Sequence, residues 1–314
     1  MPRYKLTIAY DGTDFCGWQK QEPPAEHSEI TGSGRHVDPS LETTEPGRVA
    51  LRTVQAIVEK AVREVVREPV EVKGASRTDS GVHARGQVAA FTASDDEASL
   101  VRGSGWPVSR GTDALLRAIN GRLPEDALVT GVEIVPGTFD PITDCVSKGY
   151  SYTIHASRTR PLWDRRFVHQ VWEPLEIAPM QEAAAALVGE HDFAAFAAAG
   201  HNRQTTVRAV HACTVTELAR EQWGGGPLRA PSAPVPNSGA HAETVRRLRI
   251  DISGSGFLWN MVRIIAGTLA EVGRGRLTID DVRGALSTGD RRKAGPTFPA
   301  GGLCLEWIRY RLGG

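Results

Sequence analysis

The spacing of hydrophobic residues along the first half of the chain predicts an ordered set of strands and helices. Hydrophobic residues alternate with polar or small ones from Tyr4 to Tyr10, as on a half-buried strand. From Val54 to Val66 they recur at helical spacing behind Thr53, a suitable N-cap. Further strands are expected at 70–73, 87–91 and 128–135, and a helix at 112–121. This β-α-β-β-α-β order is the ferredoxin-like arrangement.

The second half nearly repeats that order. Strands are expected at 150–155, 168–172, 210–216, 248–253 and 303–310, and helices at 180–188, 258–272 and 279–286. Pro179 precedes the first of these helices and suits its first position. We therefore expect an α+β protein with two ferredoxin-like or RRM-like lobes, residues 1–137 and 138–314, each built on an antiparallel sheet, with a cleft between them.

Two stretches interrupt the pattern. Residues 22–46 are rich in Glu, Thr, Gly and Pro, and residues 224–242 contain the run Gly-Gly-Gly-Pro and several further prolines. Neither has hydrophobic periodicity, so each is expected to be a mobile insertion.

Composition narrows the class of protein. The chain has 314 residues, of which 40% are hydrophobic and 24% charged, which is typical of a globular protein. It has no apolar run long enough to cross a bilayer and no apolar core of a secretory signal near Met1, so we expect a soluble, cytoplasmic protein. The cysteines are widely scattered and no histidine lies at ligand spacing, so no metal site is expected.

The net charge does not indicate a nucleic-acid-binding protein, because the chain has 37 basic and 37 acidic residues. Basic residues nevertheless cluster at 158–166, 246–249 and 291–293. Each cluster alone is more often a solvated surface. A neutral protein can still bind RNA when its basic residues gather on one face.

The segment from Gly74 to Ala84 carries the candidate chemistry. It has the sequence Gly-Ala-Ser-Arg-Thr-Asp-Ser-Gly-Val-His-Ala and lies between two expected strands. If Arg77 to Asp79 is extended, both charged side chains project to the same side, and the arginine favours the ionised carboxylate. An ionised carboxylate suits nucleophilic chemistry. The local pattern is equally compatible with a turn aspartate in a surface ion pair, because Asp-Ser-Gly is ordinary turn chemistry.

A family resemblance separates these interpretations. Arg77 to Ala84 resembles the active-site motif of the TruA family of bacterial tRNA pseudouridine synthases. Further segments resemble the family in the same order along nearly the whole chain: Tyr10 to Gln19, Thr53 to Gln55, Gly86 to Val88, Phe139-Asp140, Lys148 to Tyr152, Gly189 to Phe193 and Phe257 to Arg263. Ser76, Gly149 and the stretch from Asp140 to Thr143 depart from the family pattern.

The resemblance implies a role for each candidate residue. Asp79 is the expected nucleophile, Tyr150 contacts the uracil and serves as a base, Arg263 pairs with Asp79, and Arg77 anchors the RNA or orients Asp79. It implies a pseudouridine synthase fold with a central RNA-binding cleft, and a homodimer that uses no metal or cofactor. The expected substrate is a uridine of the tRNA anticodon arm at about positions 38 to 40, which leaves its stack to react.

Two rival functions make different demands on the sequence. A non-catalytic RNA-binding protein with two RRM-like sheets requires the stacking aromatics of the RRM signature, which 87–91 lacks. A hydrolase that uses Asp79 with Asp11 or Asp14 requires two carboxylates in one pocket.

Overall fold

The computed structural model describes residues 1–25, 37–95, 103–198, 204–219 and 245–311. The chain forms two compact units, Met1–Val146 with Leu305–Gly314 (unit 1) and Ser147–Cys304 (unit 2). These bounds differ from the expected 1–137 and 138–314, because the C-terminal strand leaves unit 2 after Cys304 and joins the sheet of unit 1. The fold class is confirmed as α+β with mainly antiparallel pairing.

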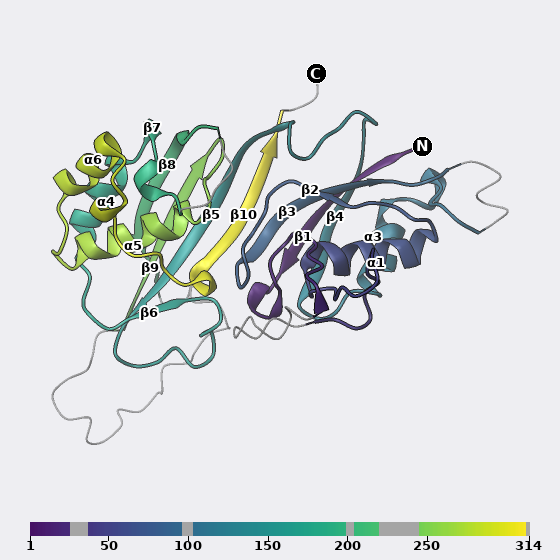
Figure 1. The fold of residues 1–314 in the computed structure, drawn as a ribbon, viewed down its shortest axis with the longest axis horizontal. Coiled ribbons are helices and arrows are strands. Elements are labelled where there is room, and N and C mark those ends of the chain that lie inside the picture. Colours follow the sequence, from purple (N-terminus) through teal and green to yellow (C-terminus); the bar gives the residue numbers. More distant parts are fainter. Residues whose placement is uncertain (26–36, 96–102, 199–203, 220–244, 312–314) are drawn as a thin grey trace. The chain divides into compact units, whose positions relative to one another are not determined.

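Unit 1 is a sheet covered on one face by helices (Figure 1). Its strands are β1 (Arg3–Tyr10), β2 (Lys73–Gly74), β3 (His83–Thr92) and β4 (Ala127–Val135), with β10 (Leu303–Tyr310) joining from Leu305 onward. The pairing order is β4-β1-β3-β10, and β2 also pairs with β3. Strands β1, β2, β3 and β4 therefore keep the ferredoxin-like order expected from the sequence.

The alternation in β1 decides which face of this sheet is covered. Tyr4, Leu6 and Ile8 are buried, whereas the intervening residues are half-exposed. The buried side chains face α1 (Val54–Val66) and α3 (Thr112–Asn120), which pack against each other on that face (Figure 1). Helix α1 begins as predicted, since the Thr53 side chain accepts a hydrogen bond from the Ala56 N–H.

In unit 2, helices again lie on one face of the strands (Figure 1). Its strands are β5 (Cys145–Ala156), β6 (His169–Val171), β7 (Gly189–Asp192), β8 (Val207–Glu217) and β9 (Arg246–Gly254), in the order β5-β9-β8-β7. Strand β6 pairs in parallel with β5, an exception to the antiparallel pairing expected. Helices α4 (Ile177–Ala186), α5 (Met261–Gly273) and α6 (Ile279–Thr288) form the helical layer.

Some expected elements differ in the structure. Helix α4 begins at Ile177, so Pro179 is its third residue rather than its first; the N–H groups of a first helical turn lack intrahelical partners, so proline is tolerated there. Strand β7 was not predicted, because Gly-Glu-His-Asp contains no hydrophobic residue.

The two expected insertions lie partly or wholly outside the described residues. The second, 224–242, lies entirely outside them, as does the middle of the first. The described flanks of the first are connected: Pro24 bridges to Arg48, and the Glu22 carboxylate accepts from both the N–H and the hydroxyl of Thr44. Among the described residues no helix is long and apolar enough to cross a membrane.

Candidate active site

Asp79 lies on the connection between β2 and β3, as the sequence indicated. Burial alternates along it: Arg77 is exposed, Thr78 is buried and Asp79 is half-buried. The Asp79 carbonyl accepts a hydrogen bond from the Val82 N–H at 3.1 Å, which closes a turn. Gly81 in this turn has φ +79°, a conformation that glycine adopts without strain. We call residues 76–82 the Asp79 loop.

The Asp79 loop is held by the segment from Tyr10 to Trp18. The Trp18 N–H donates to the Thr78 carbonyl at 3.0 Å. The Phe15 carbonyl accepts from the Gly81 N–H at 3.4 Å and from the Ser80 hydroxyl at 3.1 Å. The hydroxyls of Tyr10 and Thr78 form a buried hydrogen bond of 2.8 Å. The residues on both sides of Asp79 are therefore fixed by main-chain and side-chain bonds to one segment.

Two glycines allow the Asp79 loop and this segment to approach closely. Gly17 has φ +87°, and a Cβ there would lie 2.7 Å from the Thr78 carbonyl oxygen and 3.2 Å from the Asp79 carbonyl carbon. A Cβ on Gly74 would overlap the indole of Trp18, which is 1% exposed. The space for Asp79 thus depends on the absence of side chains at both glycines.

Buried amide side chains complete the support. The Gln87 amide accepts from the Ser76 N–H at 3.3 Å and donates to the Ser76 carbonyl at 2.6 Å. In α1, the Gln55 carbonyl oxygen accepts from the side chain of Gln19 at 2.8 Å. Gln19 in turn accepts from Nε of Arg77 at 3.3 Å, so the Arg77 guanidinium is oriented by a chain of hydrogen bonds that begins inside the core.

The Tyr10–Thr78 bond gives a testable stability effect. Replacing Tyr10 by phenylalanine removes one partner of a buried hydrogen bond, so unit 1 should lose about 1–2 kcal/mol of stability. The double variant Tyr10→Phe with Thr78→Val should lose less than the sum of the two single changes, because both polar partners are then replaced by apolar groups. Urea denaturation of the four proteins measures this; strict additivity would show that the bond does not couple the two residues.

Asp11 has a structural role that weakens the hydrolase interpretation. Its Oδ1 accepts from the Thr13 N–H at 3.0 Å and from the Thr13 hydroxyl at 2.6 Å, which caps the short 3-10 helix Gly12–Asp14. The same oxygen lies 3.2 Å from Nδ1 of His83, which also accepts from the Gly12 N–H at 3.0 Å. This carboxylate serves the turn that supports the Asp79 loop rather than acting as a second catalytic acid.

Tyr150 lies on β5 in unit 2 and is 7% exposed. Its ring packs edge-to-face against Phe257, with 5.3 Å between centroids. Phe257 itself packs close to Gly254 at the end of β9, where a Cβ would lie 3.4 Å from its ring. The position of the Tyr150 ring is therefore set by β9 and by the connection to α5.

The second tyrosine of the Tyr-Ser-Tyr motif has a different environment. The Tyr152 hydroxyl donates to the Pro299 carbonyl at 2.8 Å. Burial raises the pKa of Tyr152 above the usual range of tyrosine, so its hydroxyl stays protonated. Tyr152 is a core residue, and this leaves Tyr150 as the residue of the motif suited to chemistry.

Arg263 lies in the first turn of α5 and its guanidinium is oriented on two sides. Nε donates to the Phe298 carbonyl at 2.7 Å and Nη1 donates to Oδ1 of Asn260 at 2.7 Å. Asn260 is the N-cap of α5 and has φ +59°, although its side chain does not cap the helix. A strained non-glycine residue whose side chain instead orients an arginine is typical of a functional site.

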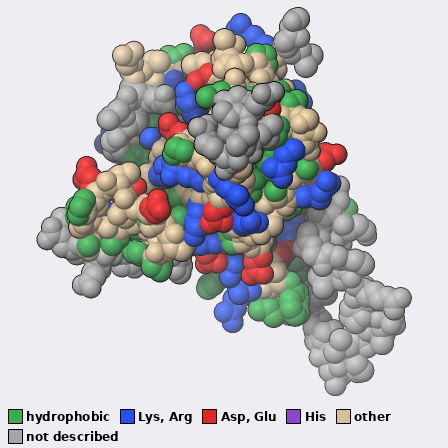
Figure 2. Space-filling view, turned by 90° about the vertical axis from the view of Figure 1, so that its right-hand side faces the viewer, with side chains coloured by type: hydrophobic (Ala, Val, Ile, Leu, Met, Phe, Trp, Pro, Cys, Tyr) green, Lys and Arg blue, Asp and Glu red, His purple; other side chains and the backbone are tan. Residues whose placement is uncertain are grey.

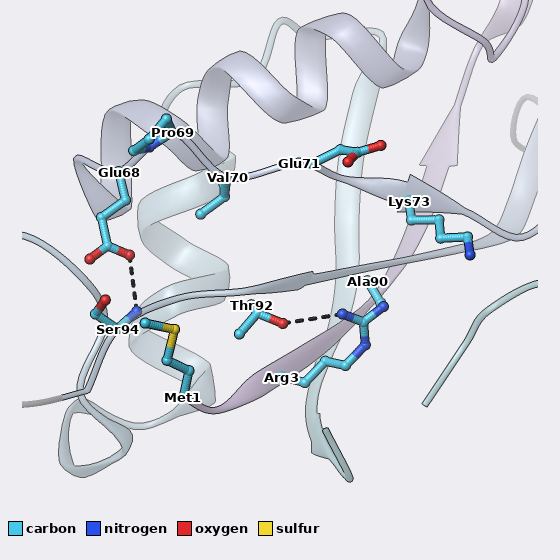
Figure 3. Close-up of a pocket in the computed structure, with 10 residues that line it drawn as sticks. All are labelled: Met1, Arg3, Glu68, Pro69, Val70, Glu71, Lys73, Ala90, Thr92 and Ser94. Carbon is cyan, nitrogen blue, oxygen red and sulfur yellow. Dashed lines mark hydrogen bonds between the residues drawn. The ribbon is translucent and has the colours of Figure 1, made fainter. Parts of the chain in front are cut away.

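Neither the charge on one face of the molecule nor a hollow in the described part of unit 1 indicates a further site. Lys and Arg side chains are interspersed with Asp and Glu on the face shown in Figure 2, in line with the zero net charge. A hollow of about 570 Å³ in unit 1 is bordered by Arg3, Glu68 and Lys73 (Figure 3). These side chains bond to the Thr92 hydroxyl, the Ser94 N–H and Asp140, so they serve the fold. The described residues contain no cluster of His, Cys, Asp or Glu suited to a metal ion.

The sequence did not indicate the roles of several residues that support the site. Phe257, Asn260, Tyr10 and Gln87 belong to segments that resemble the family, but no role was assigned to them. A polar Gln within an apolar strand, as in Gly-Gln-Val-Ala-Ala, is the signal that could have identified Gln87 as a buried hydrogen-bonding residue.

Comparison with known proteins identifies the family of the chain. A family model described as tRNA pseudouridine synthase matches residues 183–311. The chain is 39% identical to tRNA pseudouridine synthase A of Oleidesulfovibrio alaskensis, over 99% of this chain and 97% of that protein. It is 38% identical to the protein of the same name from Solidesulfovibrio magneticus, over 99% and 92% of the two chains. It is 34% identical to tRNA pseudouridine synthase A 2 of Clostridium perfringens, over 99% and 100%. The chain belongs to the tRNA pseudouridine synthase A family.

Proposed function

We propose that this protein isomerises uridine to pseudouridine in tRNA, with Asp79 as the nucleophile. The observation that carries the proposal is the match to synthases of this name over 312 residues, which spans the Asp79 loop and both candidate residues of unit 2. The rigid support of the residues that flank Asp79 agrees with it, because a nucleophile must be held in the reactive geometry.

The reaction makes and breaks a defined set of bonds. The N1–C1′ glycosidic bond breaks, a C5–C1′ bond forms, the hydrogen on C5 leaves to a base, and N1 gains a proton. The uridine must first leave its stack, which costs a few kcal/mol. Atoms balance without a redox partner. Asp79 can add to C1′, add to the pyrimidine ring or act through a glycal-type intermediate, and each of these routes requires a carboxylate at this position.

We assign supporting roles to the unit 2 residues. Tyr150 is proposed to contact the uracil and to accept the C5 proton; its ring is buried and packs edge-to-face against Phe257, which holds it in place. Arg263 is proposed as the counter-charge to Asp79, and Arg77 as a contact to the RNA backbone. The fixed orientation of the Arg263 guanidinium supports its role, because an oriented cation stabilises charge at little reorganisation cost.

The proposed substrate is the anticodon arm of tRNA, at about positions 38 to 40, with the target base flipped out. We also propose that the protein acts in the cytoplasm as a homodimer, as the family resemblance implies. Phosphate contacts by Lys and Arg should make binding fall steeply as salt rises.

A tritium-release assay tests the activity. The purified wild-type protein should release tritium from unmodified tRNA transcripts that carry 5-tritiated uridine, and the release should map to the anticodon arm. A protein that binds these transcripts yet releases no tritium from any of them would instead be an RNA-binding module, and the proposal would fail.

Asn260 offers a test of the Arg263 assignment. Asn260→Gly relieves the strain of the left-handed backbone at φ +59°. It also removes the Oδ1 atom that accepts a hydrogen bond from the Arg263 guanidinium. We expect kcat at saturating tRNA to fall about ten- to a hundredfold, because one charge-assisted hydrogen bond that orients Arg263 is worth about 1.5–3 kcal/mol. The relieved strain of about 1–2 kcal/mol offsets most of the lost bond, so the melting temperature should change little.

Arg67→Gly is the matched control for this variant. Arg67 is the other non-glycine residue with positive φ among the described residues, at 54°, and it ends α1. Its replacement relieves the same kind of backbone strain without touching Arg263, so kcat should stay at the wild-type value. Equal kcat in Asn260→Gly and wild type would contradict the positioning role of Asn260.

A further inference from the structure

The connection between β5 and β6 exposes an aromatic side chain among arginines. Residues 158–167, the Trp163 loop, extend from one end of the unit 2 sheet (Figure 1). Trp163 is 81% exposed, which is unusual for so large an apolar side chain. The arginines of this loop are all exposed: Arg158, Arg160, Arg165 and Arg166.

The one acidic residue of the Trp163 loop is neutralised from inside the fold. Asp164 forms an ion pair with Arg247 of β9, which is 5% exposed. The arginines of the loop therefore dominate its outward charge. An exposed indole within a basic surface is the chemistry that binds single-stranded nucleic acid, because bases stack on the ring while cations bind the phosphates.

The Trp163 loop is anchored, so its indole is presented on a fixed support. Nε of Arg247 donates to Nδ1 of His155 at 3.4 Å, and Nε2 of His155 bonds to the Thr159 carbonyl at 2.9 Å. On the other side of Trp163, the Phe167 N–H donates to the Asp164 carbonyl at 2.8 Å. A buried arginine thus fixes the loop at Asp164 directly and at Thr159 through His155.

We propose that Trp163 is a stacking platform for an unpaired base of the RNA substrate, with Arg165 and Arg166 binding the adjoining phosphates. This inference rests on the proposed function, and it adds a binding surface on the Trp163 loop that is separate in sequence from the Asp79 loop, Tyr150 and Arg263. Charge favours RNA over a second copy of this chain as the occupant. A twofold interface would bury the same arginine-rich patch from both copies.

The register of β6 adds a second exposed indole at the start of the loop. Ala156 pairs with Val171, and the Ser157 N–H donates to the Val171 carbonyl at 2.9 Å. Trp172 is the next residue after Val171, so it lies near Ser157, where the loop leaves β5. Its side chain is 69% exposed. Trp172 thus offers a second exposed ring on which a base can stack.

Affinity for an unmodified tRNA transcript tests the platform. Trp163→Ala should raise Kd and KM about tenfold, as expected for the loss of one stacked base. Its kcat should stay at the wild-type value. Trp163→Phe should restore most of the affinity. Leu162→Ala, which removes an exposed apolar side chain of the same loop, should bind within about twofold of wild type. Arg165→Ala should make the plot of log binding constant against log salt concentration less steep, by the amount expected for about one lost phosphate contact.

Two results would overturn the proposal. Wild-type affinity for tRNA in Trp163→Ala would show that Trp163 does not stack on a base. A halved mass of that variant in light scattering would show that the loop instead makes contact between two copies of the chain. Neither result depends on the proposed activity, which fails only if the wild-type protein releases no tritium from tRNA. Activity in wild type together with unchanged binding in Trp163→Ala would therefore reject the platform alone.

Discussion

Gly17→Ala is expected to lower the stability of unit 1 by about 3 kcal/mol and kcat by about a hundredfold. The backbone of Gly17 has φ +87°, where an alanine is strained by about 1–2 kcal/mol. Its Cβ would also lie 2.7 Å from the Thr78 carbonyl oxygen, an atom that cannot rotate away. The Asp79 loop must shift to relieve this contact, and a shift of about 1 Å at a nucleophile is enough for such a loss of rate.

Gly47→Ala separates the two causes. Gly47 has φ +79°, and a Cβ there meets no atom within 4 Å. This control should lose about 1 kcal/mol for the backbone alone and keep the wild-type kcat. Urea denaturation and single-turnover rates at saturating tRNA measure both effects. Equal rates in the Gly17 and Gly47 variants would show that close packing against Thr78 does not position Asp79.

The sequence predicted the strongly periodic elements well. Helix α1 has the expected bounds, because a hydrophobic stripe, a Thr53 cap and a left-handed C-terminal residue all act locally. Strand β10 also has its expected bounds, but its pairing with β3 depends on residues far away in the sequence and could not be predicted. Strand β7 was missed because its pairing with β8 depends on the partner strand and not on its own polar residues.

The candidate site residues Asp79, Tyr150 and Arg263 could be selected from short motifs in the sequence, but the contacts that hold them could not be predicted. The bond between Tyr10 and Thr78 joins residues 68 positions apart, and that between Arg263 and Phe298 joins residues 35 apart. No periodicity encodes such pairs, since they depend on how strands and loops meet in the folded chain. The role of Asn260 likewise appears only in its backbone angle.

Asp79→Asn should remove catalysis while the protein stays folded and binds tRNA. The amide has nearly the same shape as the carboxylate, so the main-chain bonds at Thr78 and Gly81 and the hydroxyl bond of Ser80 should persist. It carries no charge and is a far weaker nucleophile, so the rate should fall by a factor of about 10⁴ or more. Asp113→Asn, at an exposed aspartate in the first turn of α3, is the control for loss of one negative charge in unit 1.

The most direct measurement is tritium release under single-turnover conditions, with each protein in excess over unmodified tRNA that carries 5-tritiated uridine. Wild type and Asp113→Asn should release tritium at equal rates, and Asp79→Asn should release none above background while its Kd for the same tRNA stays within about threefold of wild type. Release by Asp79→Asn at a rate comparable to wild type would contradict the assignment of Asp79 as the nucleophile.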